Sequence, residues 1–191
     1  SGFSFNVPTQ ELVDEYETGD LRKDVAILDI VEWASRFGVS YGTGYEHTGY
    51  FNRKYIARKG DSNIGDQNLT NPNNYRAIRY ADVLLMAAEA NSKKTSPDET
   101  KARLYLNKVR ERAFRSTSNA VNASGNELQE AINHERRVEL AGEGHRFFDL
   151  VRTGKAAQAI EGFTLNKNEL FPLPLEEIQF ANGNWEQNPG Y

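Results

Sequence analysis

The stretch YRAIRYADVLLMAAEA, residues 75–90, decides the fold of this chain. Its apolar side chains recur with the spacing of one helical face, at i, i+4, i+7, i+8 and i+11. These positions are Ala77, Ala81, Leu84, Leu85 and Ala88. Because three of the five are alanines, a neighbouring backbone can come close to this face. The pattern predicts a long helix that begins near Tyr75.

A second helix is predicted directly after the first. Ser96, Pro97 and Glu99 fit an N-cap, a first helical residue and the acidic partner of a capping box. The helix that follows carries one apolar face, made of Ala102, Tyr105, Leu106, Val109 and Ala113. Two amphipathic helices joined by a short turn form an αα-hairpin, the unit of helical-repeat proteins. The fold is therefore predicted to be mainly α, with a TPR-like hairpin.

The rest of the chain is predicted from its breaks. A third long helix extends from Ser124 to about Ala141 and ends at Gly142 and Gly144. Shorter helices are predicted over 10–17, 145–152, 155–160 and 175–180, and a small β element over 50–57. Six glycines between positions 38 and 65 favour loop and strand over 26–75. We expect one domain, 1–191, with a loop-rich aromatic part (1–74) and a helical part (75–191).

Composition excludes several classes of function. The 191 residues carry 23 Lys and Arg against 27 Asp and Glu, and this net charge of −4 argues against nucleic acid as a partner. The chain has no cysteine, so disulfide and thiolate chemistry are excluded. No apolar run approaches the roughly 20 residues that a membrane-spanning helix needs.

Motifs of catalysis and of metal or cofactor binding find no match. His134-Glu135 begins like a helical zinc-protease motif, but Val138 stands where the second histidine belongs. Asp61–Asp66 has oxygen ligands at alternate positions, but Gly65 is fifth rather than sixth, and no glutamate closes the loop. Phosphate loops and nucleophile elbows do not occur. We therefore expect no enzyme activity, no metal and no cofactor.

Residues 33–55 are unusually aromatic. They hold seven rings, against about two or three expected from the chain average of 11%. Flat rings cover the C–H faces of sugars while polar side chains bond the hydroxyls, and Glu46 and His47 lie nearby for that role. The candidate ligand-binding residues are Trp33, Tyr41, Tyr45, Tyr50, Asn52 and Arg53. The alternative is that many of these rings pack in the core, as aromatic residues usually do.

Acidic and basic residues alternate along the third helix and beyond it. Glu135 and Glu139 lie along or beside its apolar stripe, where a half-buried carboxylate needs a partner. Arg136, Arg137, Arg146 or Arg152 are the expected partners. We predict a structural block of ion pairs: Glu135, Arg136, Glu139, Arg146, Asp149 and Arg152. A glycoside hydrolase that uses Glu135, Glu139 or Glu143 is a remote alternative.

Five motifs in order resemble the SusD/RagB family. The first begins at Pro8 with PTQELV and continues to Glu17, Asp20 and Arg22. The stretch 75–90 and the run 107–113 are similar to two successive helices of the family. The block 132–152, with ERRVEL and EGHRFFDLVR, resembles its most distinctive segment. FPLP at 171–174 and QNPGY at 187–191 resemble its C-terminal signature.

The resemblance implies a non-catalytic protein of the outer membrane of Bacteroidota. Such proteins are lipid-anchored at the extracellular face through an N-terminal cysteine, which is missing here, and they pass glycans or other nutrients to a SusC-like TonB-dependent transporter. The resemblance covers only the C-terminal part of a typical member. We therefore expect Ala77, Ala81, Leu84 and Ala88 to pack partly on the N-terminal helical repeats of a longer parent chain. A protein-interaction module that contacts the transporter, with ligand contacts elsewhere, is the alternative function.

Overall fold

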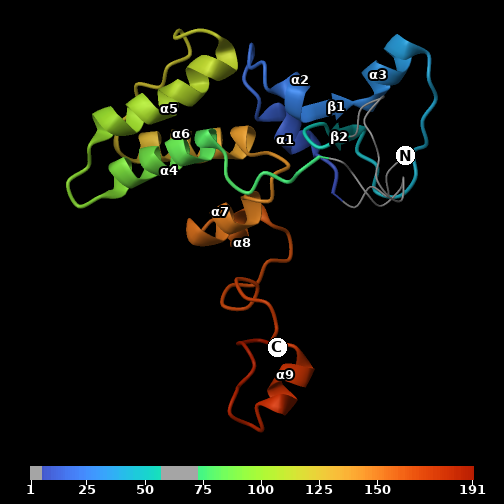
Figure 1. Ribbon diagram of the computed structural model, residues 1–191, viewed down its shortest axis with the longest axis vertical. Coiled ribbons are helices and arrows are strands. Elements are labelled where there is room, and N and C mark those ends of the chain that lie inside the picture. Colours follow the sequence, from blue (N-terminus) through green and yellow to red (C-terminus); the bar gives the residue numbers. More distant parts are fainter. Residues whose placement is uncertain (1–5, 57–72) are drawn as a thin grey trace. The chain divides into compact units, whose positions relative to one another are not determined.

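The computed structural model describes residues 6–56 and 73–191, and these residues are mainly helical (Figure 1). The chain divides into two compact units, Ser1–Gly144 and His145–Tyr191, which are described separately. Within the described residues, no helix combines the length and apolar character needed to cross a membrane.

Three long helices form the main core of the first unit. They are α4 (Tyr80–Lys93), α5 (Glu99–Phe114) and α6 (Gly125–Glu139), and α4 with α5 makes the predicted hairpin. Leu85, Leu106, Leu128 and Ile132 are fully buried where the three helices meet. Figure 1 shows α6 lying along this hairpin. Burial of each such side chain contributes about 1.5–3 kcal/mol, so this contact dominates the stability of the unit.

Two expectations about α4 and α5 are wrong. Ala81, Leu84 and Ala88 are buried inside this three-helix core, so they do not face outward. Ala77 is exposed and precedes the helix, because α4 begins at Tyr80 and not near Tyr75. The exposed apolar residues of α4 are instead Tyr80, Val83 and Met86, on the opposite face. The N-cap of α5 is Asp98, whose carboxylate accepts the backbone N–H of Lys101, and not Ser96.

The N-terminal part of this unit combines short helices with a two-stranded antiparallel sheet. Its elements are α1 (Gln10–Asp14), α2 (Lys23–Ala26), β1 (Ile27–Asp29), α3 (Ile30–Phe37) and β2 (Tyr50–Asn52). In the sheet Ile27 lies opposite Asn52, and Asp29 lies opposite Tyr50. The prediction of loop and strand over 26–75 is wrong at α3. Asp29 caps the start of this helix by accepting two backbone N–H groups, and Gly38 ends it with φ +63°.

A second apolar cluster joins these elements to α6. It consists of Val13, Tyr16, Ala26, Ile27 and Val138. The Tyr16 hydroxyl donates to the Val138 carbonyl at 3.1 Å, so the one polar atom of this ring is satisfied inside the cluster. The sheet, and with it α3, is therefore fixed to the C-terminal half of α6.

The second unit has α7 (Arg146–Arg152), α8 (Ala156–Ala159) and α9 (Leu175–Phe180). Its QNPGY end is tied to the FPLP segment by side-chain amides. Gln187 accepts from the Leu173 N–H at 2.7 Å and donates to the Leu173 carbonyl at 2.9 Å. Asn188 donates to the Phe171 carbonyl at 2.6 Å. Both C-terminal motifs therefore form one structural clasp.

Candidate functional site

Helix α3 and the loop 38–49 that follows it expose four aromatic rings, and we call these residues the aromatic segment. The four rings are Trp33, Phe37, Tyr41 and Tyr45. Trp33 and Phe37 lie one helical turn apart with ring centroids separated by 5.1 Å. In Figure 1 the segment lies at the far side of β1 and β2 from α4–α6. All four rings are among the exposed large apolar side chains, so the packing alternative does not account for them.

The tip of the aromatic segment is Tyr45. Its side chain is 88% exposed, and its backbone is left-handed, with φ +57°. This conformation costs a residue with a Cβ roughly 1–2 kcal/mol. Trp33 and Tyr41 are less exposed, at 39% and 38%. Three of the four aromatic candidates from the sequence therefore present ring surface to solvent.

The other three candidates use their polar groups within the fold. The Tyr50 hydroxyl donates to Gln10 Oε1 at 2.8 Å, and the Arg53 guanidinium donates to the Asp24 carbonyl at 2.7 Å. Asn52 Nδ2 donates to the Gly142 carbonyl at 3.1 Å. A Cβ on Gly142 would lie 2.3 Å from that nitrogen, so only glycine lets Asn52 approach there. These residues support the sheet, and the ligand-binding prediction depends on the aromatic segment.

Beneath α6 lies an ion network centred on Glu135, Glu139 and Glu143. All three acids are buried, and Glu135 has no exposed surface. Arg110 approaches Glu135 at 2.9 Å, and Arg79 approaches Glu139 at the same distance. Arg22 contacts both Glu135 and Glu139, and Arg112 contacts Glu139. Glu143 is contacted by Lys54 and also by Arg79. Each buried carboxylate therefore has at least two cationic partners.

The network favours the charged forms of Glu139 and Glu143. Burial works to raise the pKa of Glu139, but Arg112, Arg22 and Arg79 outweigh it, and the pKa is lowered. The same holds for Glu143, where Arg79 and Lys54 overcome the effect of burial. Burial also works to lower the pKa of Arg22, yet Asp20 and Glu135 raise it. A glycosidase acid needs a raised pKa, so the electrostatics oppose that role for Glu139 and Glu143.

The arginines that bind these acids differ from the expected ones. Arg136 pairs with Asp82 at 2.8 Å, and Arg137 pairs with Glu11 and Glu15. Asp149 and Arg152 pair with each other across one turn of α7 at 2.7 Å. Within the first unit, the expectation that Arg136 or Arg137 neutralises Glu135 and Glu139 is therefore wrong. No local pattern indicates the Arg22 partner, because Arg22 lies 113 residues from Glu135 in the sequence.

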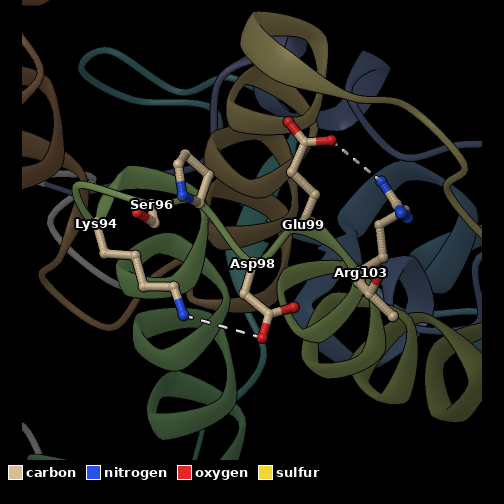
Figure 2. Close-up of a pocket in the computed structure, with 7 residues that line it drawn as sticks. Lys94, Ser96, Asp98, Glu99 and Arg103 are labelled. Carbon is tan, nitrogen blue, oxygen red and sulfur yellow. Dashed lines mark hydrogen bonds and ion pairs between the residues drawn. The ribbon is translucent and has the colours of Figure 1, made fainter.

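A polar hollow lies at the turn between α4 and α5 (Figure 2). Its charged side chains face one another: Lys94 lies 3.9 Å from Asp98, and Arg103 lies 3.5 Å from Glu99. The Asp98 carboxylate is also the N-cap of α5. These groups serve the helix end and each other, so we assign no ligand there.

Metal ligands do not gather anywhere in residues 6–56 and 73–191. Within them, no three His, Cys, Asp or Glu side chains are placed to hold an ion. The calcium-like run Asp61–Asp66 lies outside the described residues.

The comparisons with known proteins agree with the motifs. The model of the SusD family matches residues 32–191, and the chain belongs to this family. SusD-like protein P2 of Formosa agariphila is 31% identical over the whole chain, which covers 41% of that protein.

Solved structures of relatives share the fold. A laminarin-binding SusD-like protein is 42% identical with a TM-score of 0.81, and the match covers 100% of this chain and 39% of that one. Surface glycan-binding protein A from Bacteroides thetaiotaomicron, in complex with laminarihexaose, is 29% identical with a TM-score of 0.75, over 94% of this chain and 40% of that one. The chain therefore spans about two fifths of the length of these three relatives.

Proposed function

We propose that this chain takes part in non-catalytic binding of a glycan, through the aromatic segment. The observation that carries the proposal is the exposure of Trp33, Phe37, Tyr41 and Tyr45 on one helix and its following loop. Relatives named for binding laminarin and for a laminarihexaose complex support a glucan as the ligand class.

The chemistry of the segment suits a sugar. A pyranose ring presents apolar C–H faces that an aromatic ring covers, and its hydroxyls stay in contact with water or polar side chains. Two or three such contacts on an open surface predict micromolar to millimolar affinity, roughly 4–8 kcal/mol. Weak capture of this kind suits a protein that must release its ligand.

We further propose that the glycan is delivered to a SusC-like TonB-dependent transporter. Membership of the SusD family supports this role. It also supports a location at the extracellular face of the outer membrane and a lipid anchor on the parent protein. The exposed apolar residues of α4, which include Tyr80, Val83 and Met86, support a contact with the N-terminal helical repeats of a longer parent. A module that contacts the transporter, with ligand contacts elsewhere, is the competing function.

Affinity for laminarihexaose, measured by calorimetry on the 191-residue chain, tests the proposal. Trp33→Ala should weaken binding about fivefold to a hundredfold, because a stacked ring contributes about 1–3 kcal/mol. Trp185→Ala is the matched control, since Trp185 belongs to the second unit and is 53% exposed. Unchanged affinity in Trp33→Ala and Tyr41→Ala, with binding by the unaltered chain, would favour the interaction module.

The same samples test the absence of catalysis. We expect no new reducing ends when laminarihexaose is incubated with the chain. Release of reducing ends that is lost in Glu139→Gln or Glu143→Gln would instead establish the glycosidase alternative.

A further inference from the structure

His47 connects the aromatic segment to the sheet. Its ring stacks on Tyr41, with centroids 5.8 Å apart and planes 22° apart. The same ring meets Phe51 of β2 edge to face, at 5.4 Å and 79°. Phe51 is half-buried, whereas Tyr41 is exposed. The imidazole therefore lies between a fixed ring of the sheet and an exposed ring of the loop.

A hydrogen bond from the backbone sets the orientation of the imidazole. His47 Nδ1 accepts the N–H of Gly49 at 2.9 Å. Gly49 has φ +88°, which bends the chain back toward the histidine, and its carbonyl accepts the N–H of Ile30 at the start of α3. Nδ1 is therefore used as the acceptor of a backbone hydrogen bond.

The second ring nitrogen of His47, Nε2, makes no such hydrogen bond. It is buried, and it has no hydrogen-bond partner in the part of the chain that the structure describes. An unpartnered buried donor destabilises a fold, so hydrogen bonding through Nε2 is not the reason for a histidine here. What the residue supplies is a flat face toward Tyr41, an edge contact with Phe51 and one acceptor for Gly49.

We propose that His47 is a positioning residue for glycan binding: it holds the ring of Tyr41 in the plane in which that ring stacks on the sugar. The proposal rests on the glycan-binding function above. His47 itself does not touch the ligand, because its face is taken by Tyr41 and its Nε2 is covered.

Two substitutions separate the ring of His47 from its acceptor. His47→Asn keeps an acceptor, because an asparagine oxygen bonds the backbone N–H two residues on, but it removes the flat support for Tyr41. His47→Phe keeps the support and loses the acceptor. His145→Asn is the matched control, since His145 belongs to the second unit.

The first readout is affinity for laminarihexaose. His47→Asn should weaken binding about threefold to tenfold, close to the effect of Tyr41→Ala, since a positioned ring pair is worth about that factor. His47→Phe should stay within about twofold of the unaltered chain. Equal affinity in His47→Asn and the unaltered chain would overturn the proposal.

The second readout does not depend on any glycan. In a chain labelled with 3-fluorotyrosine, the ¹⁹F resonance of Tyr41, assigned by its loss in Tyr41→Phe, should move toward the unfolded position in His47→Asn. It should stay near its native position in His47→Phe and His145→Asn. If Tyr41→Ala binds laminarihexaose normally, Tyr41 does not stack on the sugar, and the positioning role in glycan binding is overturned whatever the fluorine signal shows. If Tyr41→Ala binds weakly but the Tyr41 resonance does not move in His47→Asn, the glycan-binding function stands and the positioning role of His47 is overturned.

Discussion

The ion network beneath α6 and the aromatic segment on α3 depart from the usual burial rule in opposite directions. Glu135, Glu139 and Glu143 are charged and buried, whereas Trp33 and Tyr45 are aromatic and exposed. The contacts of the network explain its burial in full, because each carboxylate has cationic partners within the chain. The contacts of the aromatic segment leave much of it exposed: His47 supports Tyr41, Phe37 contacts Trp33 and Arg36, but Trp33 and Tyr45 are still 39% and 88% exposed. A buried charge or an exposed aromatic ring therefore indicates a function only where the chain itself supplies no side chain to pair with it.

Removing the central acid of the network should have the largest effect. Glu135→Leu leaves Arg22 and Arg110 without a shared buried carboxylate, although Asp20, Glu17 and Glu139 still reach them. Breaking a buried pair from one side costs about 3–5 kcal/mol, and we expect a loss near the lower end. Urea unfolding of the variant measures it.

The control for that change is Glu111→Leu, an exposed acid on α5, which should shift the free energy of unfolding by no more than about 0.5 kcal/mol. If Glu135→Leu were as stable as the unaltered chain, the network would be dispensable. The buried charges would then have no structural role to contrast with the exposed rings.

The two regions also differ in how much of each the sequence could predict. The helices α4, α5, α6 and α9 were predicted because periodicity, proline and glycine are local signals. The arginine partners of Glu135 and Glu139 are not predicted from the sequence. Arg22, for example, is more than a hundred residues from both acids along the chain and meets them only in the folded structure. Local charge spacing favoured Arg136, which the fold instead turns toward Asp82.

For the aromatic segment the density of rings over 33–55 predicts four aromatic ligand-binding residues. Three of them, Trp33, Tyr41 and Tyr45, are exposed, whereas Tyr50 is half-buried against the second apolar cluster. The helix that carries Trp33 is not predicted because the glycines that follow it dominate the pattern, although Asp29 and Glu32 have capping-box spacing. The sequence indicates His47 only as a partner for sugar hydroxyls. Its stacking on Tyr41 depends on the bend at Gly49, which side-chain types do not reveal.

Acid should weaken the network before it affects the aromatic segment. The pKa values of Glu139 and Glu143 are lowered in the folded chain, whereas in the unfolded chain they return toward the ordinary value of 4.5. Their contribution to stability is therefore fully present above about pH 5, and it is lost as pH falls through the lowered folded values. Thermal unfolding should give a flat melting temperature from about pH 7 to 5 and a steep decline below that.

Glu139→Gln provides the control, because an amide does not titrate. This variant should be less stable at neutral pH and should show a shallower decline in acid than the unaltered chain. A decline of equal steepness in both proteins would mean that other carboxylates control acid unfolding, and the lowered pKa of Glu139 would carry no stability.

The smallest effect on stability should come from the tip of the aromatic segment. Tyr45→Gly relieves a left-handed backbone, worth roughly 1–2 kcal/mol, and adds freedom to the unfolded chain, which costs about 0.4–1 kcal/mol. The free energy of unfolding should therefore change by no more than about 1.6 kcal/mol, toward greater stability. Tyr45→Ala keeps the left-handed strain and removes the same ring, so it should be the less stable of the two variants.

Both variants of Tyr45 should weaken laminarihexaose binding equally if Tyr45 contacts the sugar. If Tyr45→Gly is stabilised and binds as well as the unaltered chain, the strained tip serves some purpose other than the glycan, and the exposed rings that remain to carry binding are those of α3 and Tyr41.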